Sequence, residues 1–315
     1  MDFYRFFLHD IEIYLQEIVD AVITGDAADP RSKELPRRWG VGFHGWAKCL
    51  AYDVRSERCE LGDIVLGDEG SREGVTPSVD IMDLGGMTDT DEFDGRTLLL
   101  DFTGMEQPAI FYLLKCLREK HRVRRLFGAY TEPLRYRAAA GPPFEEAFDL
   151  TEEFIEFRAL PGFLRPYDRG RGRQLVVYMG FEGRRFLKVL EEVNPQPRHT
   201  HAVFGIPAFQ PGWQYLTLGS NQTALEISRA ELHRAEANNP FDAFDVAERV
   251  AGGTRDFQLV LAPIGTKPHA VGAALYALRH DEALLIYDFP IKHRLFRTEG
   301  VGKTSVYDLT EIVLE

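Results

Sequence analysis

The sequence has few cysteines, no long apolar run and a deficit of positive charge, and each absence excludes a class of protein. The three cysteines among 315 residues, Cys49, Cys59 and Cys116, have neither the density of a disulfide framework nor the spacing of a zinc motif. No uninterrupted apolar stretch is long enough to span a bilayer. The first residues lack the basic start and small-residue cleavage site of a signal peptide. We therefore expect a cytoplasmic protein with reduced thiols and no membrane association.

The charge balance disfavours binding to duplex nucleic acid. Lys and Arg number 37 against 49 Asp and Glu, which gives a formal net charge of -12 at pH 7. Each phosphate contact needs a local cation, and a negative global field opposes approach to a polyanion. Two basic stretches stand out, residues 118–125 and 165–173. We interpret both as solvated or protein-contacting faces rather than as nucleic-acid grooves.

The remaining composition is that of a globular protein, with 44% hydrophobic and 27% charged residues. A chain of this length can bury a core as one large domain or two smaller ones. Apolar residues recur at helical spacing from Phe3 to Val22, which predicts an amphipathic helix that ends near Thr24 and Gly25. Its other face is acidic, so we expect it to dock on protein, in a partner interface or in self-association.

A β-hairpin is expected over residues 41–66, with its turn at 55–58. We place a domain boundary near Gly95, so that residues 1–95 form a smaller N-terminal α+β region. From residue 96 onward the pattern changes to alternating strands and helices.

This second region repeats a strand, loop and helix plan three times. The strand-like runs 97–102, 174–179 and 257–262 each end in a loop with Gly and polar residues, and apolar residues at helical spacing follow. The pattern predicts an α/β fold with a Rossmann-like, mainly parallel sheet over residues 96–315. The irregular region 134–173 either divides two Rossmann-like halves or forms a long insertion over one sheet, and the sequence leaves both open.

The third repeat carries the clearest expected ligand site. Gly265, Thr266 and Lys267 connect its strand to a helix that opens with Pro268. N–H groups at a helix start and the positive end of the helix dipole attract phosphate or carboxylate, and a lysine adds a full charge. His269, in the first turn, is a further candidate contact, although a lone histidine is more often a satisfied core or surface residue.

The first two repeats supply the remaining candidates, because the carboxyl ends of parallel strands share one edge of a sheet and ligands bind there. The ligand-binding candidates are glycine, polar and basic residues of the two loops: Thr103, Gly104, Gly180, Gly183 and Arg184. Asp101, Glu106 and Glu182 are weaker catalytic candidates, since an acidic residue at a strand end or helix start is also an ordinary cap.

Two other patterns are rejected as functional sites. Gly300–Ser305 imitates the end of a P-loop, but the first glycine of that motif is missing, and we expect a terminal hairpin turn. His199 and His201 are two residues apart and can face the same side of a strand. No nearby cysteine or carboxylate completes a ligand set, so we expect no metal site.

The runs Asp101–Gly104 and Gly265–Lys267 resemble the ligand loops of CRISPR-associated Rossmann-fold (CARF) sensor domains of prokaryotic antiviral defence. The shared features are an aspartate-ended strand with a Thr-Gly loop and a Gly-Thr-Lys run that opens an Ala-rich helix. In that group the loops cradle cyclic or linear oligonucleotide signals. The resemblance implies the same role for five residues: Thr103, Gly104, Gly265, Thr266 and Lys267. The nuclease or helix-turn-helix effector that often accompanies such sensors has no recognisable motif here.

Three functional classes follow. The favoured one is a non-enzymatic nucleotide-sensing or scaffold subunit of an antiviral defence assembly, with a nucleotide or oligonucleotide ligand, a protein partner or homo-oligomer, and no assigned cofactor. The second is an enzyme acting on nucleotides or nucleosides, with Asp101, Glu106 or Glu182 as acid or base and Lys267 as phosphate clamp. The third is a structural interaction subunit whose loops are only turns.

Overall fold

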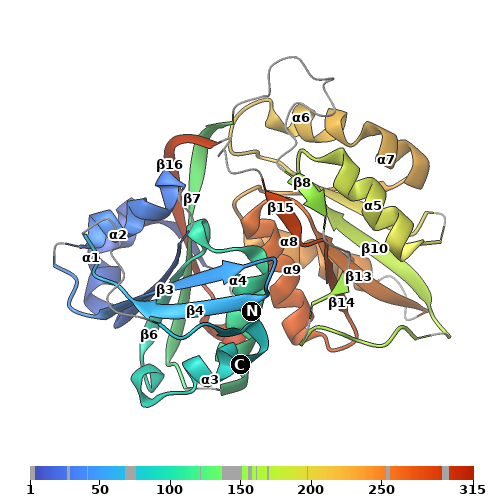
Figure 1. Cartoon of the computed structure of the whole chain (residues 1–315). Helices are drawn as coiled ribbons and strands as arrows, with labels where there is room; N and C mark the ends of the chain where they lie inside the picture. Colours follow the sequence, from blue (N-terminus) through green and yellow to red (C-terminus); the bar gives the residue numbers. More distant parts are fainter. Residues whose placement is uncertain are drawn as a thin grey trace. The chain divides into compact units, whose positions relative to one another are not determined.

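The computed structural model describes residues 4–26, 29–40, 42–67, 76–120, 122–136, 151–154, 158–160, 162–168, 170–196, 198–252, 256–292 and 298–315. The chain divides into two compact units (Figure 1), unit 1 with residues 1–134 and 300–315 and unit 2 with residues 135–299. The boundary expected near Gly95 does not coincide with this division. The strand that follows Gly95 pairs in one sheet with a strand from the first 95 residues.

Unit 1 contains eight strands and several short helices among its described residues. The strands are β1 (Arg5–Phe7), β2 (Ala21–Gly25), β3 (Trp46–Asp53), β4 (Arg58–Asp63), β5 (Val79–Asp80), β6 (Thr97–Asp101), β7 (Arg125–Tyr136) and β16 (Thr298–Asp308). The α-helices are α1 (Leu8–Ile18), α2 (Glu34–Trp39), α3 (Leu84–Thr88), α4 (Gln107–Lys120) and α10 (Thr310–Leu314). The 3-10 helices are η1 (Pro30–Lys33), η2 (Ile81–Asp83), η3 (Asp91–Phe93) and η4 (Phe102–Gly104).

The strands of unit 1 form one mixed sheet in the order β1-β16-β7-β6-β2-β3-β4-β5. The pairs β7–β6, β6–β2 and β2–β3 are parallel, whereas β3–β4, β4–β5 and β1–β16 are antiparallel. The expected hairpin is therefore confirmed as β3 and β4, which meet at a turn over residues 54–57.

The expected N-terminal helix is shorter than its periodicity suggested. It covers Leu8–Ile18, and residues 21–25 form the central strand β2, which is buried along its whole length. Pairing with β3 and β6 overrides the helical pattern, since tertiary contacts decide between marginal local preferences. Leu8 and Leu15 pack into the core of their own unit. Phe3 lies outside the described residues.

The turn expected at Gly300–Ser305 is instead part of strand β16. This strand pairs with β1 from the other end of the sequence, with Phe7 opposite Ser305 and Phe6 opposite Val306. Ser305 and Val306 are fully buried there. A partner 300 positions away leaves no local signal, so the sequence pattern alone pointed to a turn.

Unit 2 contains a second sheet and five α-helices among its described residues. The strands are β8 (Thr151–Phe154), β9 (Arg158–Ala159), β10 (Gly172–Tyr178), β11 (Thr200–Gly205), β12 (Glu231–Ala235), β13 (Phe257–Pro263), β14 (Leu284–Tyr287) and β15 (Pro290–Lys292). The helices are α5 (Gly183–Val193), α6 (Trp213–Ser220), α7 (Gln222–Ser228), α8 (Pro240–Ala251) and α9 (Lys267–Arg279).

The expected α/β fold with a Rossmann-like parallel sheet is confirmed. Five strands of unit 2 run parallel in the order β12-β11-β10-β13-β14, β9 joins antiparallel beside β14, and β8 pairs with β15 separately. Numbered along the chain, the five parallel strands have the order 3-2-1-4-5 of Rossmann folds. Helices α5 and α7 cover one face of the sheet and α8 and α9 the other (Figure 1).

Glycine and alanine let α8 and α9 approach each other closely. A Cβ atom built on Gly272 of α9 would lie 2.2 Å from the carbonyl oxygen of Pro240 in α8, so only glycine fits this contact. None of the helices in the described part of the chain is long and apolar enough to cross a membrane.

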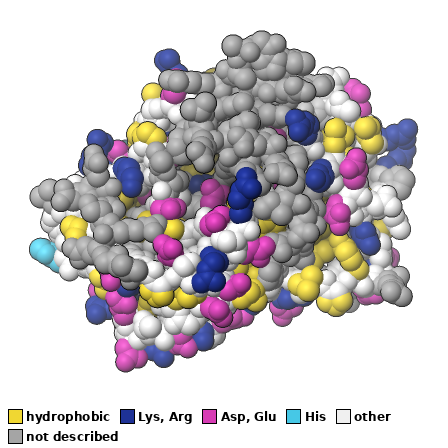
Figure 2. Space-filling view, in the orientation of Figure 1, with side chains coloured by type: hydrophobic (Ala, Val, Ile, Leu, Met, Phe, Trp, Pro, Cys, Tyr) yellow, Lys and Arg dark blue, Asp and Glu magenta, His cyan; other side chains and the backbone are white. Residues whose placement is uncertain are grey.

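The basic stretch 118–125 is neutralised by acidic side chains of unit 1. Lys120 and Arg122 both bind the carboxylate of Asp89, at 2.8 and 2.7 Å. Arg125 binds Asp308 at 3.2 Å. On the face drawn in Figure 2, Lys and Arg side chains likewise lie among Asp and Glu side chains. The basic side chains of this stretch therefore form intramolecular ion pairs.

The basic stretch 165–173 makes contacts within unit 2. Arg165 pairs with Asp281 at 3.0 Å, and the guanidinium carbon of Arg173 lies 3.9 Å from the ring centre of Tyr167. Arg169 lies outside the described residues. Of the region expected to divide two halves, 134–173, residues 137–150, 155–157 and 161 lie outside the described residues as well.

Candidate functional site

The strand order of unit 2 reverses between β10 and β13. From β10 the chain passes through α5 to β11 on one side, and from β13 it passes through α9 to β14 on the other. Ligands of open parallel sheets bind at such a reversal, outside the carboxyl ends of the strands. The two loops at this point are residues 179–182 and 264–266. The structure thus brings the second and third candidate loops together.

The backbones of these two loops are in direct contact. A Cβ atom on Gly180 would lie 2.8 Å from the carbonyl oxygen of Ile264, and one on Gly265 would lie 2.4 Å from the carbonyl oxygen of Met179. Real Cβ atoms do not approach oxygen this closely, so the two glycines are required for the contact. Their first role is to hold the loops together, and any ligand contact comes from their backbone.

Gly183 has a similar packing role at the start of α5. A Cβ atom there would lie 1.9 Å from the carbonyl oxygen of Ser220. Asn221, the next residue, donates from its side-chain amide to the carbonyl oxygen of Gly180 at 2.8 Å. The junction of α6 and α7 therefore packs against the β10–α5 loop and stabilises it.

A buried ion pair fixes the geometry of the reversal. Arg185 on α5 donates from Nε and Nη2 to the two carboxylate oxygens of Asp288, each at 2.6 Å, and from Nη1 to the carbonyl oxygen of Ile264 at 3.0 Å. Burial acts to lower the pKa of Arg185, but the adjacent Asp288 carboxylate raises it above its usual value. The guanidinium therefore stays charged and ties α5 to the ends of β13 and β14.

The three carboxylates considered for acid–base catalysis belong to two different units. Glu182 lies in unit 2, where its Oε2 is 3.4 Å from Nη1 of Arg185. Asp101 and Glu106 belong to unit 1. Glu182 thus takes part in the buried ion pairing around Arg185.

The start of α9 has fewer free N–H groups than the sequence suggested. Thr266 caps the helix, because its Oγ1 accepts the N–H of His269 at 3.3 Å and donates to the carbonyl oxygen of Ala237 at 2.9 Å. Pro268 has no N–H to offer. The anion attraction of this loop therefore rests mainly on Lys267, whose side chain is partly exposed.

His269 lies in the core rather than at the ligand edge. It is fully buried, and its Nε2 donates to the carbonyl oxygen of Glu236 at 3.0 Å. A ring nitrogen that faces a carbonyl oxygen must carry the proton. Burial lowers the pKa of His269 to about 4, so the ring is neutral at neutral pH. The expected ligand contact of His269 is thus replaced by a structural one.

The first candidate loop, residues 101–104, belongs to unit 1 and is buried there. Thr103 and Asp101 are both 1% exposed, and Asp101 Oδ1 accepts the N–H of Thr103 as an ordinary cap. Thr103 Oγ1 accepts the N–H of Thr131 at 2.9 Å. A Cβ atom on Gly104 would lie 2.7 Å from Cβ of Ser32. The expectation that all three loops share one sheet edge is therefore wrong, because the chain builds two sheets.

Aromatic and basic side chains border the β10–α5 loop. The ring of Phe181 meets those of Tyr136 and Trp213 edge-on, with centroid distances of 5.4 and 6.0 Å. All three rings are partly exposed, and Arg184 is exposed on the first turn of α5. Aromatic rings can stack on nucleobases, and arginine binds phosphate through paired N–H groups. These aromatic residues are far apart in sequence, so no local pattern pointed to them.

Within the described residues, one further group has the composition of a metal site: His201, Glu231 and His233. His199, which is two residues before His201 in the sequence, is not part of this group. Its ring stacks on Phe257, with ring centres 4.0 Å apart. The partners of His201 instead come from the next strand, 30 residues later. This group was missed because only strand pairing brings it together.

We compared the chain with known protein families, curated proteins and solved structures. No protein-family model, no curated protein and no solved structure matches the chain.

Proposed function

We propose that this protein is a nucleotide-sensing or scaffold subunit of a prokaryotic antiviral defence assembly, and that it binds a phosphate-containing ligand on unit 2. The observation that carries the ligand site is the strand reversal between β10 and β13, with a glycine loop at the end of each strand. The defence context comes from the CARF-like runs, of which Gly265–Lys267 lies at this reversal. The genes that neighbour its own gene test that context directly.

Three groups have distinct roles in this proposal. Lys267 and Arg184 supply positive charge for the phosphate, since both side chains reach solvent. Phe181 and Trp213 offer ring faces for a base. The Arg185–Asp288 pair keeps the loops in place before the ligand arrives, which reduces the ordering that binding requires.

A binding role is favoured over an enzymatic one by the distribution of the carboxylates. A general acid or base must lie within hydrogen-bond reach of the proton that it moves. Glu182 is buried beside Arg185, and Asp101 is buried in unit 1. Glu182 is thus engaged by Arg185 at the reversal rather than held as a free acid–base group.

The test is ligand identification followed by matched variants. Small molecules released from natively purified protein are identified by mass spectrometry, and mononucleotides and linear or cyclic oligonucleotides are titrated with tryptophan fluorescence and calorimetry as readouts. Lys267→Ala and Arg184→Ala are compared with Arg279→Ala, which removes the same charge at the opposite end of α9.

We expect Lys267→Ala and Arg184→Ala each to weaken binding by about tenfold or more, because a charge-assisted hydrogen bond is lost. Arg279→Ala should bind as the wild type does. Unchanged binding in both loop variants would reject this site. A wild type that binds no nucleotide but retains a stoichiometric protein partner would favour the purely structural function.

A further inference from the structure

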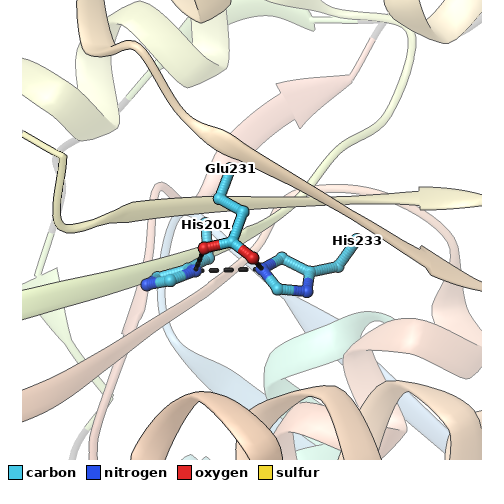
Figure 3. A group of neighbouring side chains, drawn as sticks. All are labelled: His201, Glu231 and His233. Carbon is cyan, nitrogen blue, oxygen red and sulfur yellow. Dashed lines mark hydrogen bonds and ion pairs between the residues drawn. The ribbon is translucent and has the colours of Figure 1, made fainter. Parts of the chain in front are cut away.

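Three potential metal ligands lie on one face of two neighbouring strands. His201 is on β11, and Glu231 and His233 are on β12. In the parallel pairing, His201 is opposite Glu231 and Val203 is opposite His233. Alternate residues of a strand point to the same face, so the three side chains converge. Figure 3 shows both imidazole rings and the carboxylate directed toward a common point.

The donor atoms have the separations of a coordination shell. His201 Nδ1 lies 2.9 Å from His233 Nε2 and 3.6 Å from Glu231 Oε2, and His233 Nε2 lies 3.8 Å from Glu231 Oε1. Ligands about 2.0–2.2 Å from a tetrahedral ion are about 3.3–3.6 Å apart. Small side-chain adjustments thus suffice to place an ion among the three.

We propose that His201 Nδ1, His233 Nε2 and the Glu231 carboxylate bind one divalent transition-metal ion of the zinc class, with a fourth position left for water or another ligand. Two imidazoles and one carboxylate are a ligand set that zinc takes in proteins when one position stays open. The set carries a single negative charge, which partly compensates the ion.

A neighbouring glutamine supports the orientation of His201. His201 Nε2 lies 3.0 Å from the amide nitrogen of Gln174 on β10, and both residues are buried. The amide nitrogen donates this hydrogen bond to His201 Nε2, so Nδ1 carries the ring proton and donates it to His233 Nε2 at 2.9 Å. Binding of an ion at Nδ1 requires the Gln174 amide to turn over, so that its oxygen accepts the proton on Nε2. Metal-bound histidines typically make such a hydrogen bond with their second nitrogen.

The position of the group separates it from the proposed ligand loops. Glu231 is the first residue of β12 and His201 the second of β11, so the group lies near the amino ends of the strands, away from the reversal at their carboxyl ends. Strand β12 is also the edge of the sheet. A bound ion would cross-link this edge strand to β11, and the exposed Glu231 gives the ion access from solvent.

Zinc binding to the full-length protein tests the proposal. Metal is first removed with a chelator, the protein is then dialysed against increasing concentrations of zinc, and bound zinc is measured by mass spectrometry for the wild type, His233→Gln and Glu231→Gln. His199→Gln and His280→Gln are the controls, since His280 pairs with Glu248 elsewhere in unit 2. We expect one equivalent in the wild type and both controls, and at least tenfold weaker binding in the two ligand variants.

Cobalt substitution and thermal unfolding distinguish this site from thiol binding. Nitrogen and oxygen ligands give visible d–d bands without the near-ultraviolet charge-transfer band of thiolate, and the cysteines lie buried in unit 1. Zinc should raise the melting temperature of the wild type but not of His233→Gln. No zinc in the wild type, a thiolate band, or equal zinc in His233→Gln would overturn the proposal. Nucleotide binding should be the same in His233→Gln and the wild type, so the two proposals fail independently.

Discussion

Arg185 and Asp288 form a buried, bidentate ion pair at the carboxyl end of the second sheet, with both N–O distances at 2.6 Å. Arg185 follows β10, Asp288 follows β14, and the same guanidinium donates to Ile264 after β13. One side chain thus links the ends of three strands. The relation is specific to arginine, because only a planar fork can serve both carboxylate oxygens and a carbonyl together.

Removing one partner of this pair should strongly destabilise unit 2. Arg185→Met leaves a buried carboxylate without its counter-ion, and Asp288→Leu leaves a buried guanidinium, each at a cost of about 3–5 kcal/mol. The double variant should lose less than Arg185→Met, since the Asp288 carboxylate is no longer buried without its counter-ion and only Glu182 of the three charged groups remains. Urea unfolding followed by the fluorescence of Trp213, with Trp39 and Trp46 of unit 1 replaced by Phe, measures this. Additive losses in the double variant would contradict the pairing energetics.

The glycine contact at the reversal gives a second stability prediction. Gly265→Ala places a methyl group 2.4 Å from the carbonyl oxygen of Met179, so the two loops must separate, and we expect a loss of about 3 kcal/mol. The control is Gly86→Ala in α3, where no atom lies within 4 Å of the added Cβ. That change should be neutral or stabilise by about 0.5–1 kcal/mol. Equal effects of the two substitutions on denaturant unfolding would show that the loops are not in contact.

Free thiols give a prediction for unit 1. Cys49, Cys59 and Cys116 are all buried, and burial raises the pKa of Cys59 and Cys116 to about 11. The thiolate is the reactive form, so all three should react slowly with a thiol reagent at pH 8 in the native protein. Addition of denaturant should release three fast-reacting thiols. A fast-reacting thiol in the native protein would show that one site opens to solvent.

Local features of the sequence were sufficient for the strand–loop–helix units. The runs that end in Asp101 and Pro263 are apolar strands, each followed within a few residues by a helix, so neighbouring residues determine them. Strand β2 and strand β16 were missed, because each is defined by partners distant in sequence. The same limit applies to the site. The loops at Gly180 and Gly265 were identified from turn chemistry, whereas His233 joins His201 only through the register of two strands.

The two sheets also share a feature that local patterns did not reveal. In unit 1, a Cβ atom on Gly25 would lie 2.0 Å from the carbonyl carbon of Gly104, just as Gly265 meets the backbone after β10 in unit 2. Both contacts join loops at the carboxyl ends of adjacent parallel strands. Buried side chains such as Thr103 surround the contact in unit 1, whereas the partly exposed Lys267 lies next to the contact in unit 2. We therefore propose a ligand only for the contact in unit 2.

Acid sensitivity of unit 2 should depend on His269. Its pKa is about 4 in the folded protein because of burial, against about 6.5 in an unfolded chain. The unfolded chain therefore takes up the proton first. The stabilisation from the neutral ring is complete above about pH 6.5 and is lost as the pH falls toward 4, by on the order of 3 kcal/mol. His269→Gln keeps an N–H donor for the carbonyl oxygen of Glu236 and does not titrate. The variant should lose some stability at pH 7 through imperfect packing, but its unfolding free energy should fall less between pH 7 and pH 4.5 than that of the wild type. Parallel pH profiles of the two proteins in urea unfolding would show that another group causes the acid sensitivity.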